Sequence, residues 1–133
     1  MSFQFSTTAR NAALDSIETA IGVSPTLEIR SGTVPANCAA ADSGTVLASM
    51  ALPSDWLAAA SNGVKSLSGT WQDIAANASG TAGHFRIKAG ATCHIQGTVT
   101  ITGGGGDMTL DNTNVAINQQ ITITAFSVTA GGV

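Results

Sequence analysis

The sequence predicts a mainly β protein: an antiparallel β-sandwich or jelly-roll-like domain with an N-terminal arm and one α-helix. From Pro25 onward, apolar and polar residues alternate in short segments, and a period of two is typical of strands that bury one face. Gly, Asn and Ser separate roughly seven or eight such segments, at the spacing found in sandwiches and small barrels. The chain of 133 residues is long enough for one compact domain. We expect an arm and helix over 1–22 and a β-sandwich over 23–133.

The N-terminal segment predicts an arm followed by a helix. Residues 2–6, SFQFS, alternate apolar and polar and are interpreted as a short strand or arm. In the following STTARNAALDSIETAIG, Thr7 or Thr8 can cap the start of a helix, and Gly22 stands where the helix would stop. One stripe of this helix carries its apolar residues, which are Ala13, Leu14, Ile17, Ala20 and Ile21. Because the stripe is narrow and rich in Ala, the helix should lie on a sheet or in a subunit contact.

The segments after Pro25 follow in order. TLEIR places Leu27 and Ile29 on one side of a strand. TVLASMAL points alternate residues inward, namely Val46, Ala48, Met50 and Leu52. Between them, SGTVPANCAAADSG has the composition of a loop, and PSDWLAAASNG afterwards that of a short helical turn. Further strands are expected within GTWQDIAAN, GHFRIK, TCHIQGTVTI, DMTLDN and QITITAFSVTA.

The last of these segments changes its apolar phase. Ile121, Ile123 and Ala125 share one face of the expected strand, whereas Phe126 and Val128 lie on the other. Either a bulge restores the register near Ala125, or both faces are covered at the end of the strand. A strand covered on both faces near a chain terminus would indicate a contact with another subunit.

Both histidines and one of the two cysteines lie in GHFRIKAGATCHIQGTVTI, residues 83–101. Alternation predicts a hairpin with a three-residue turn over 89–91. The register that aligns the apolar faces points the pairs Phe85–Ile95 and Ile87–Cys93 inward, and the pairs Arg86–His94 and His84–Gln96 outward. Neighbouring residues on a strand face opposite ways, so neither a metal site nor a Cys–His dyad is expected here.

Two further sequence patterns do not predict a catalytic, phosphate-binding or metal-binding site either. The run GGGGD lacks the Lys-Ser/Thr of a phosphate-binding loop and is interpreted as a flexible loop. Its neighbours Asp107, Asp111, Asn112 and Asn114 do not have the spacing of a calcium-binding EF-hand. We therefore expect no enzymatic activity, no catalytic residues, no bound metal and no cofactor.

The N-terminal sequence has no basic segment followed by an apolar one, so we expect no signal peptide and synthesis in the cytoplasm. In that compartment Cys38 and Cys93 should be thiols. Their separation in the sequence leaves open whether they pair after exposure to an oxidant.

Charge is scarce. Charged residues make up 10% of the chain and the net charge is −3, against roughly 25% charged residues in ordinary soluble domains. The 5 basic residues are scattered, which argues against nucleic acid as a partner. No apolar run is long enough to span a membrane. A surface of Ala, Gly, Ser and Thr costs little to desolvate, so the chain is expected to be a subunit of a homo-oligomer.

Two tryptophans, Trp56 and Trp71, are open to two interpretations. They could stack on a sugar ring, as in carbohydrate-binding modules. The interpretation that we favour makes them large core or interface anchors in a chain with no Tyr.

The chain also resembles a known group of sequences. The segments that carry the resemblance cover nearly the whole chain: NAALDSIETAIG, PANCAAADSGTVLA, LPSDW, GTWQD, ASGTAGHFRI, HIQGTVT and GGGGDMTLDNTNVAINQQITITAFSVTAGG. They are similar to a family of small proteins encoded among the structural genes of tailed bacteriophages and prophages. No catalytic or ligand residue carries over from this family.

The resemblance implies a virion component, with other virion proteins as partners. A compact β domain best suits a capsid decoration (cement) protein that binds neighbouring copies of the major capsid protein. The alternatives are a fibre or adaptor protein of the tail or head–tail connector, or a carbohydrate-binding module for host attachment. The expected interface residues are Phe3, Phe5, Leu14, Ile17, Ile21, Phe126 and Val128.

Overall fold

The computed structural model describes residues 3–130 and confirms a mainly β fold with one N-terminal helix. Helix α1 spans Thr7–Ile21. The strands are β1 (Thr26–Ser31), β2 (Val46–Ala51), β3 (Val64–Ser66), β4 (Trp71–Asp73), β5 (Gly80–Ala89), β6 (Thr92–Ile101), β7 (Met108–Leu110), β8 (Asn114–Val115), β9 (Ile121–Ile123) and β10 (Ser127–Thr129).

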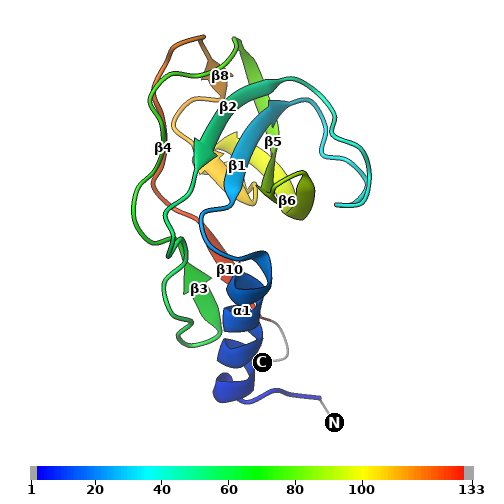
Figure 1. The fold of residues 1–133 in the computed structure, drawn as a ribbon, viewed down its shortest axis with the longest axis vertical. Helices are drawn as coiled ribbons and strands as arrows, with labels where there is room; N and C mark the ends of the chain where they lie inside the picture. The colour runs from blue at the N-terminus through cyan, green and yellow to red at the C-terminus, as the bar shows by residue number, and fades with distance from the viewer. Residues whose placement is uncertain (1–2, 131–133) are drawn as a thin grey trace.

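The main sheet has the order β2-β1-β5-β6-β7, with β8 paired to the start of β5. Two small sheets, β4-β9 and β3-β10, complete the strands. The sheet curls strongly, and helix α1 lies beside β3 and β10 at the opposite end of the molecule from β8 (Figure 1). The arrangement is sandwich-like, because the β4-β9 pair packs over the inner face of the main sheet in one core.

The ends of helix α1 follow from its capping residues. Ser6 accepts a hydrogen bond from the Ala9 amide through its hydroxyl, and Gly22 ends the helix at a φ of 95° that a residue with a side chain rarely adopts. The cap is thus Ser6, directly before the predicted Thr7. The predicted stripe is confirmed in part: Leu14 and Ile21 are buried and Ile17 is half-buried, whereas Ala13 and Ala20 are exposed.

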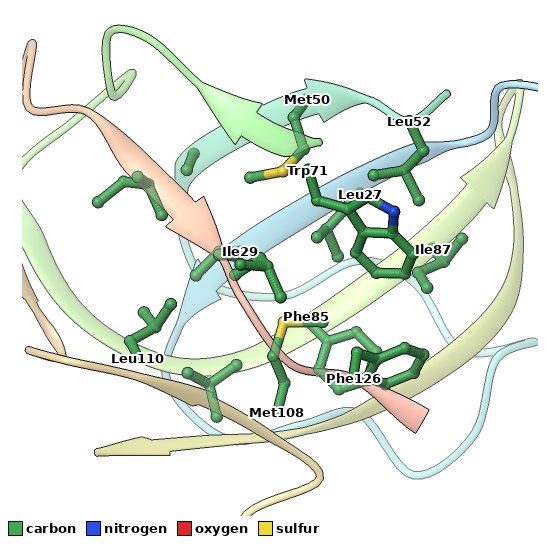
Figure 2. Packing of buried hydrophobic residues seen from close by; sticks show 14 of the residues in the cluster. Leu27, Ile29, Met50, Leu52, Trp71, Phe85, Ile87, Met108, Leu110 and Phe126 are labelled. Atoms are coloured by element: carbon green, nitrogen blue, oxygen red, sulfur yellow. The ribbon is translucent and has the colours of Figure 1, made fainter. Parts of the chain in front are cut away.

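The core confirms the predicted alternation of β1 and corrects that of β2: Ala48, Met50 and Leu52 are buried as expected, but Val46 is only half-buried and Leu47 is fully buried, next to a register shift in the β1–β2 pairing. Leu27 and Ile29 of β1 are fully buried, and Figure 2 shows them meeting Trp71 of β4 and Phe85 of β5. The ring of Trp71 lies 5.5 Å from that of Phe126, centroid to centroid. Offset and edge contacts of this kind are the favourable arrangements of aromatic rings.

The predicted register of the β5–β6 hairpin is wrong by two residues. Ile87 pairs with Ile95 and Arg86 with Gln96, and a bulge after Ile87 then pairs Lys88 with Cys93. The bulge shortens the predicted three-residue turn. It also moves Cys93 from the predicted inner face to the face of Lys88, because one extra residue exchanges the two faces of a strand.

Two further expectations are corrected, and the expected loop at the glycine run is observed between β6 and β7. Residues 53–63 form no helical turn; Leu57 and Ser61 make isolated β-bridges there instead. The phase change near Ala125 is not a bulge within one strand: the chain leaves the sheet of β9 and enters that of β10, and Phe126 is buried in the chain's own core. The glycine run over 103–106 is a turn that folds back on β6, and this return makes β6 and β7 parallel neighbours.

Candidate functional site

The N-terminal arm carries the most exposed aromatic side chains of residues 3–130. Phe3 is 77% exposed and Phe5 is 50% exposed. Their rings contact each other edge to face, with centroids 5.1 Å apart. Phe5 also borders a shallow hollow of about 420 Å³ against helix α1, together with Ala9 and Ala130. The arm therefore presents apolar surface that nothing in the described chain covers.

The other predicted interface residues are less accessible. Ile17 and Val128 are half-buried against the core. Leu14, Ile21 and Phe126 are buried in the chain's own core. These three side chains have no surface left for a partner, which corrects the expectation that they are interface anchors.

The interpretation of the tryptophans as a sugar platform is wrong. Trp56 and Trp71 are both 0% exposed. Trp56 Nε1 donates to the carbonyl of Gly22 at 3.0 Å, and Trp71 Nε1 donates to that of Ser68 at 3.1 Å. Each ring is a core anchor whose single donor is satisfied inside the chain.

A first group of charges, in which the cation Lys65 is buried, joins helix α1 to β3, and we call it the Lys65 cluster. Lys65 Nζ lies 2.6 Å from Asp15 Oδ1 and 3.0 Å from Glu18 Oε1. Burial disfavours the charged amine, but the hydrogen bonds to both carboxylates outweigh this effect and raise the pKa of Lys65. The same carboxylates accept the amides of Ala60 and Leu57. Sequence periodicity missed this cluster, since its members lie far apart in the chain.

A second group lies on the outer face of β1, β5 and β6. The connection between β1 and β2, residues 32–45, runs over this face, and we call it the cover loop; it is the cyan loop in Figure 1. Arg86 Nη1 donates to Asp42 Oδ1 at 2.8 Å, and Arg86 Nη2 donates to the carbonyl of Asn37 at 3.0 Å. Gln96 Nε2 donates to the carbonyl of Pro35 at 2.8 Å. Arg86 is consequently only 2% exposed.

Two more cations complete this second group, the Arg86 cluster. Lys88 Nζ lies 2.7 Å from Asp42 Oδ2, and Arg30 Nη2 lies 2.9 Å from Glu28 Oε1. The hydrogen bond from Lys88 holds the pKa of Asp42 below its ordinary value against the opposing effect of burial, with further help from Arg86. The prediction that this face meets solvent or a partner is therefore wrong: alternation separates two faces but does not say what covers each.

The remaining polar residues of the hairpin do not converge. His84 is fully buried, and its Nδ1 lies 3.0 Å from the carbonyl of Gly32, whereas His94 is exposed. Within residues 3–130, no three side chains of His, Cys, Asp or Glu come together in a way that could hold a metal ion. Over the same range, no helix has both the length and the apolar character needed to cross a bilayer.

The two cysteines meet at the edge of the Arg86 cluster. Cys38 in the cover loop and Cys93 in β6 have their sulfur atoms 2.6 Å apart, and both residues are half-buried. Burial and the hydrogen bond to Cys38 raise the pKa of Cys93 to about 12. No sequence pattern predicts this contact, because it depends on the bulge in the β5–β6 pairing and on the path of a loop without periodicity.

The comparisons with known proteins found no matching family profile, no matching curated protein and no matching solved structure.

The Lys65 cluster and the Arg86 cluster together determine how many charged side chains remain on the surface. They contain four of the 5 basic residues of the chain, paired with four of its 8 acidic residues. Four of the five cationic side chains are therefore withdrawn from solvent, whereas their partners Asp15 and Asp42 keep 51% and 34% of their side-chain surface exposed. The surface that a partner could touch is consequently poor in cations.

Proposed function

We propose that this protein is a structural subunit of a bacteriophage particle, most simply a capsid decoration protein that binds neighbouring capsid subunits. The internal placement of four basic residues is the observation that carries the proposal. An interface between permanent subunits must be desolvated, and small polar or apolar groups are desolvated at little cost. A fibre or adaptor of the tail or head–tail connector is the alternative within the same class.

The proposed mechanism is binding without catalysis. The exposed rings of Phe3 and Phe5 are the anchors, and each ring adds apolar area worth about 25 cal/mol per Å² when it is buried on a neighbour. Repetition over many symmetry-related copies turns a weak contact into a stable layer. A homo-oligomer and the capsid protein are both suitable neighbours for such an arm.

The arm is better tested by substitution than by deletion of residues 1–22. Removal of the whole helix would leave the buried Lys65 without Asp15 and Glu18, so the β domain itself would be destabilised. Replacing Phe3 and Phe5 by Ser changes only exposed side chains. A matched control is Ile74→Ser, since Ile74 is 76% exposed and belongs to a different part of the chain.

The experiment complements a gene deletion in the phage or prophage with the wild-type chain, the double variant or the control. Copies per purified particle are then counted by quantitative mass spectrometry. We expect the wild type and the control at equal occupancy, and a loss of roughly tenfold or more for the double variant, because two aromatic anchors are removed. Incorporation of the double variant at the wild-type level would exclude the arm as the anchor.

The copy number of the wild-type chain tests the function itself. Hundreds of copies in each particle would support a capsid lattice position, and a few to some dozens would support the head–tail connector or a fibre. Complete absence of the chain from purified particles would overturn the proposal of a virion protein.

A further inference from the structure

We propose that Cys38 and Cys93 form an intrachain disulfide that fastens the cover loop to strand β6. Their sulfur atoms are 2.6 Å apart, which is closer to the covalent S–S length of about 2.05 Å than to an ordinary thiol contact. The proposal is independent of the proposed function, because it rests only on the fold.

Two separate features of the fold bring the sulfur atoms together. On the loop side, the Asn37 side chain accepts the amide of Ala40, and its carbonyl accepts from Arg86, so the turn that contains Cys38 is fixed to the sheet. On the strand side, the bulge after Ile87 turns Cys93 to the covered face. Neither feature depends on the cysteines, so the contact is built by the surrounding structure.

The position also admits a small oxidant. A hollow of about 400 Å³ opens over the two cysteines, and Ala91, Thr92 and Arg86 contribute to its lining. Oxidised glutathione, a low-molecular-weight disulfide with carboxylates, is the class of reagent that we name for the reaction.

The exchange proceeds in two balanced steps. Cys93 Sγ donates to Cys38 Sγ, and the raised pKa of Cys93, about 12, keeps this thiol protonated at neutral pH, so Cys38 makes the first attack. Cys38 displaces one glutathione thiolate from oxidised glutathione and forms a mixed disulfide. Cys93 then attacks the Cys38 sulfur, and the second glutathione leaves with the proton of Cys93. In sum, two protein thiols become one disulfide, and one oxidised glutathione becomes two reduced ones.

The test uses the full chain, purified under reducing conditions and then exposed to oxidised glutathione. Acid quenching, alkylation and intact-mass measurement follow. We expect the alkylatable thiols to fall from two per chain to none, with the loss of two hydrogen masses and a peptide that links Cys38 to Cys93. Cys38→Ser and Cys93→Ser are the matched controls; each should keep a single cysteine, free or joined to glutathione.

Two outcomes would overturn the proposal. One is a wild-type chain that gains two glutathione adducts or forms linked dimers while its two cysteines stay unjoined. The other concerns the fastening of the cover loop, which amide hydrogen exchange measures over residues 33–44. Exchange there should slow on oxidation of the wild type and stay unchanged in Cys38→Ser; equal exchange in the oxidised and reduced wild type would contradict it.

Discussion

The ammonium group of Lys65 in β3 lies 2.6 Å from Asp15 Oδ1 of helix α1, although the Lys65 side chain is only 3% exposed. Glu18, one turn further along the helix, supplies the second carboxylate. The helix is therefore attached to the β domain by a buried charge as well as by Leu14 and Ile21.

This attachment leads to a first prediction. The double substitution Asp15→Asn with Glu18→Gln leaves Lys65 buried without a counter-charge, and we expect it to lower the free energy of unfolding clearly more than Lys65→Met does. Lys65→Met removes the buried charge, while both carboxylates keep backbone donors, and it should change stability by less than about 1 kcal/mol. Urea denaturation at neutral pH measures both. Equal losses in the two variants would contradict this account.

A second prediction concerns acid stability. The hydrogen bond from Lys88 holds the pKa of Asp42 below its ordinary value of 3.8, so the folded state binds fewer protons at this site than the unfolded state. The stabilisation is present above pH 3.8 and is lost as the pH falls through the lower pKa of the folded state. Asp42→Asn should therefore lower the urea midpoint at pH 7, and it should lose less on acidification than the wild type does.

The same pair, Asp42 and Lys88, also makes the stability of the fold depend on pH in the alkaline range. The hydrogen bond to Asp42 raises the pKa of Lys88 above 10.5. This contribution is complete below pH 10.5 and is lost as the pH rises through the raised pKa. A urea midpoint that is independent of pH below 3.8 or above 10.5 would contradict the role of the pair.

A third prediction concerns the aromatic core. Trp71 is fully buried between Trp56 and Phe126, and Trp71→Ala should cost about 3–5 kcal/mol of unfolding free energy because it leaves a large cavity. In the wild type, both indole rings should emit at short wavelength and resist quenching by iodide. Titration with a host polysaccharide should leave the emission unchanged; a strong response would show that a ring is accessible after all.

A fourth prediction concerns the contact between β5 and the start of the cover loop. A Cβ atom on Gly83 would lie 2.2 Å from the carbonyl oxygen of Gly32. Backbone atoms cannot move aside as a flexible side chain can, so Gly83→Ala should destabilise the fold by about 1–3 kcal/mol. Thr81→Ala, at an exposed position of the same strand, is the control. We expect faster hydrogen exchange in the cover loop of the Gly83 variant only.

The sequence predicts those parts of the fold that follow from a pattern among neighbouring residues, such as the alternation of a strand with one buried side. Alternation identifies Leu27 and Ile29 as core residues, since a strand with one buried side must alternate. Gly22 identifies the end of the helix, since few other residues adopt its φ of 95°. Both rules depend on residues that are neighbours in the chain.

The parts that sequence reasoning missed depend on residues that are distant in the chain. Its place in the alternating pattern predicts that Arg86 lies on the surface. Arg86 is buried because the cover loop packs on it, and no periodic pattern in the sequence of that loop predicts this contact. The register of the hairpin differs because a bulge adds a single residue, and apolar residues at both Cys93 and Ile95 fit either pairing. The glycine run is compact because Gly106 lies against Thr100, where a Cβ would be 2.8 Å from the Thr100 methyl carbon.

The partition of charge has a consequence for engineering the protein. The four cations and four anions of the two clusters cancel, so the net charge of −3 is the sum of one arginine and four aspartates outside them: Arg10, Asp55, Asp73, Asp107 and Asp111. Asp55 and Asp111 accept no hydrogen bond from another residue of the described chain. Replacing these two by Asn or Lys should therefore shift the isoelectric point and the electrophoretic mobility while the melting temperature stays constant. Recharged versions of this small scaffold can be made without altering its interior.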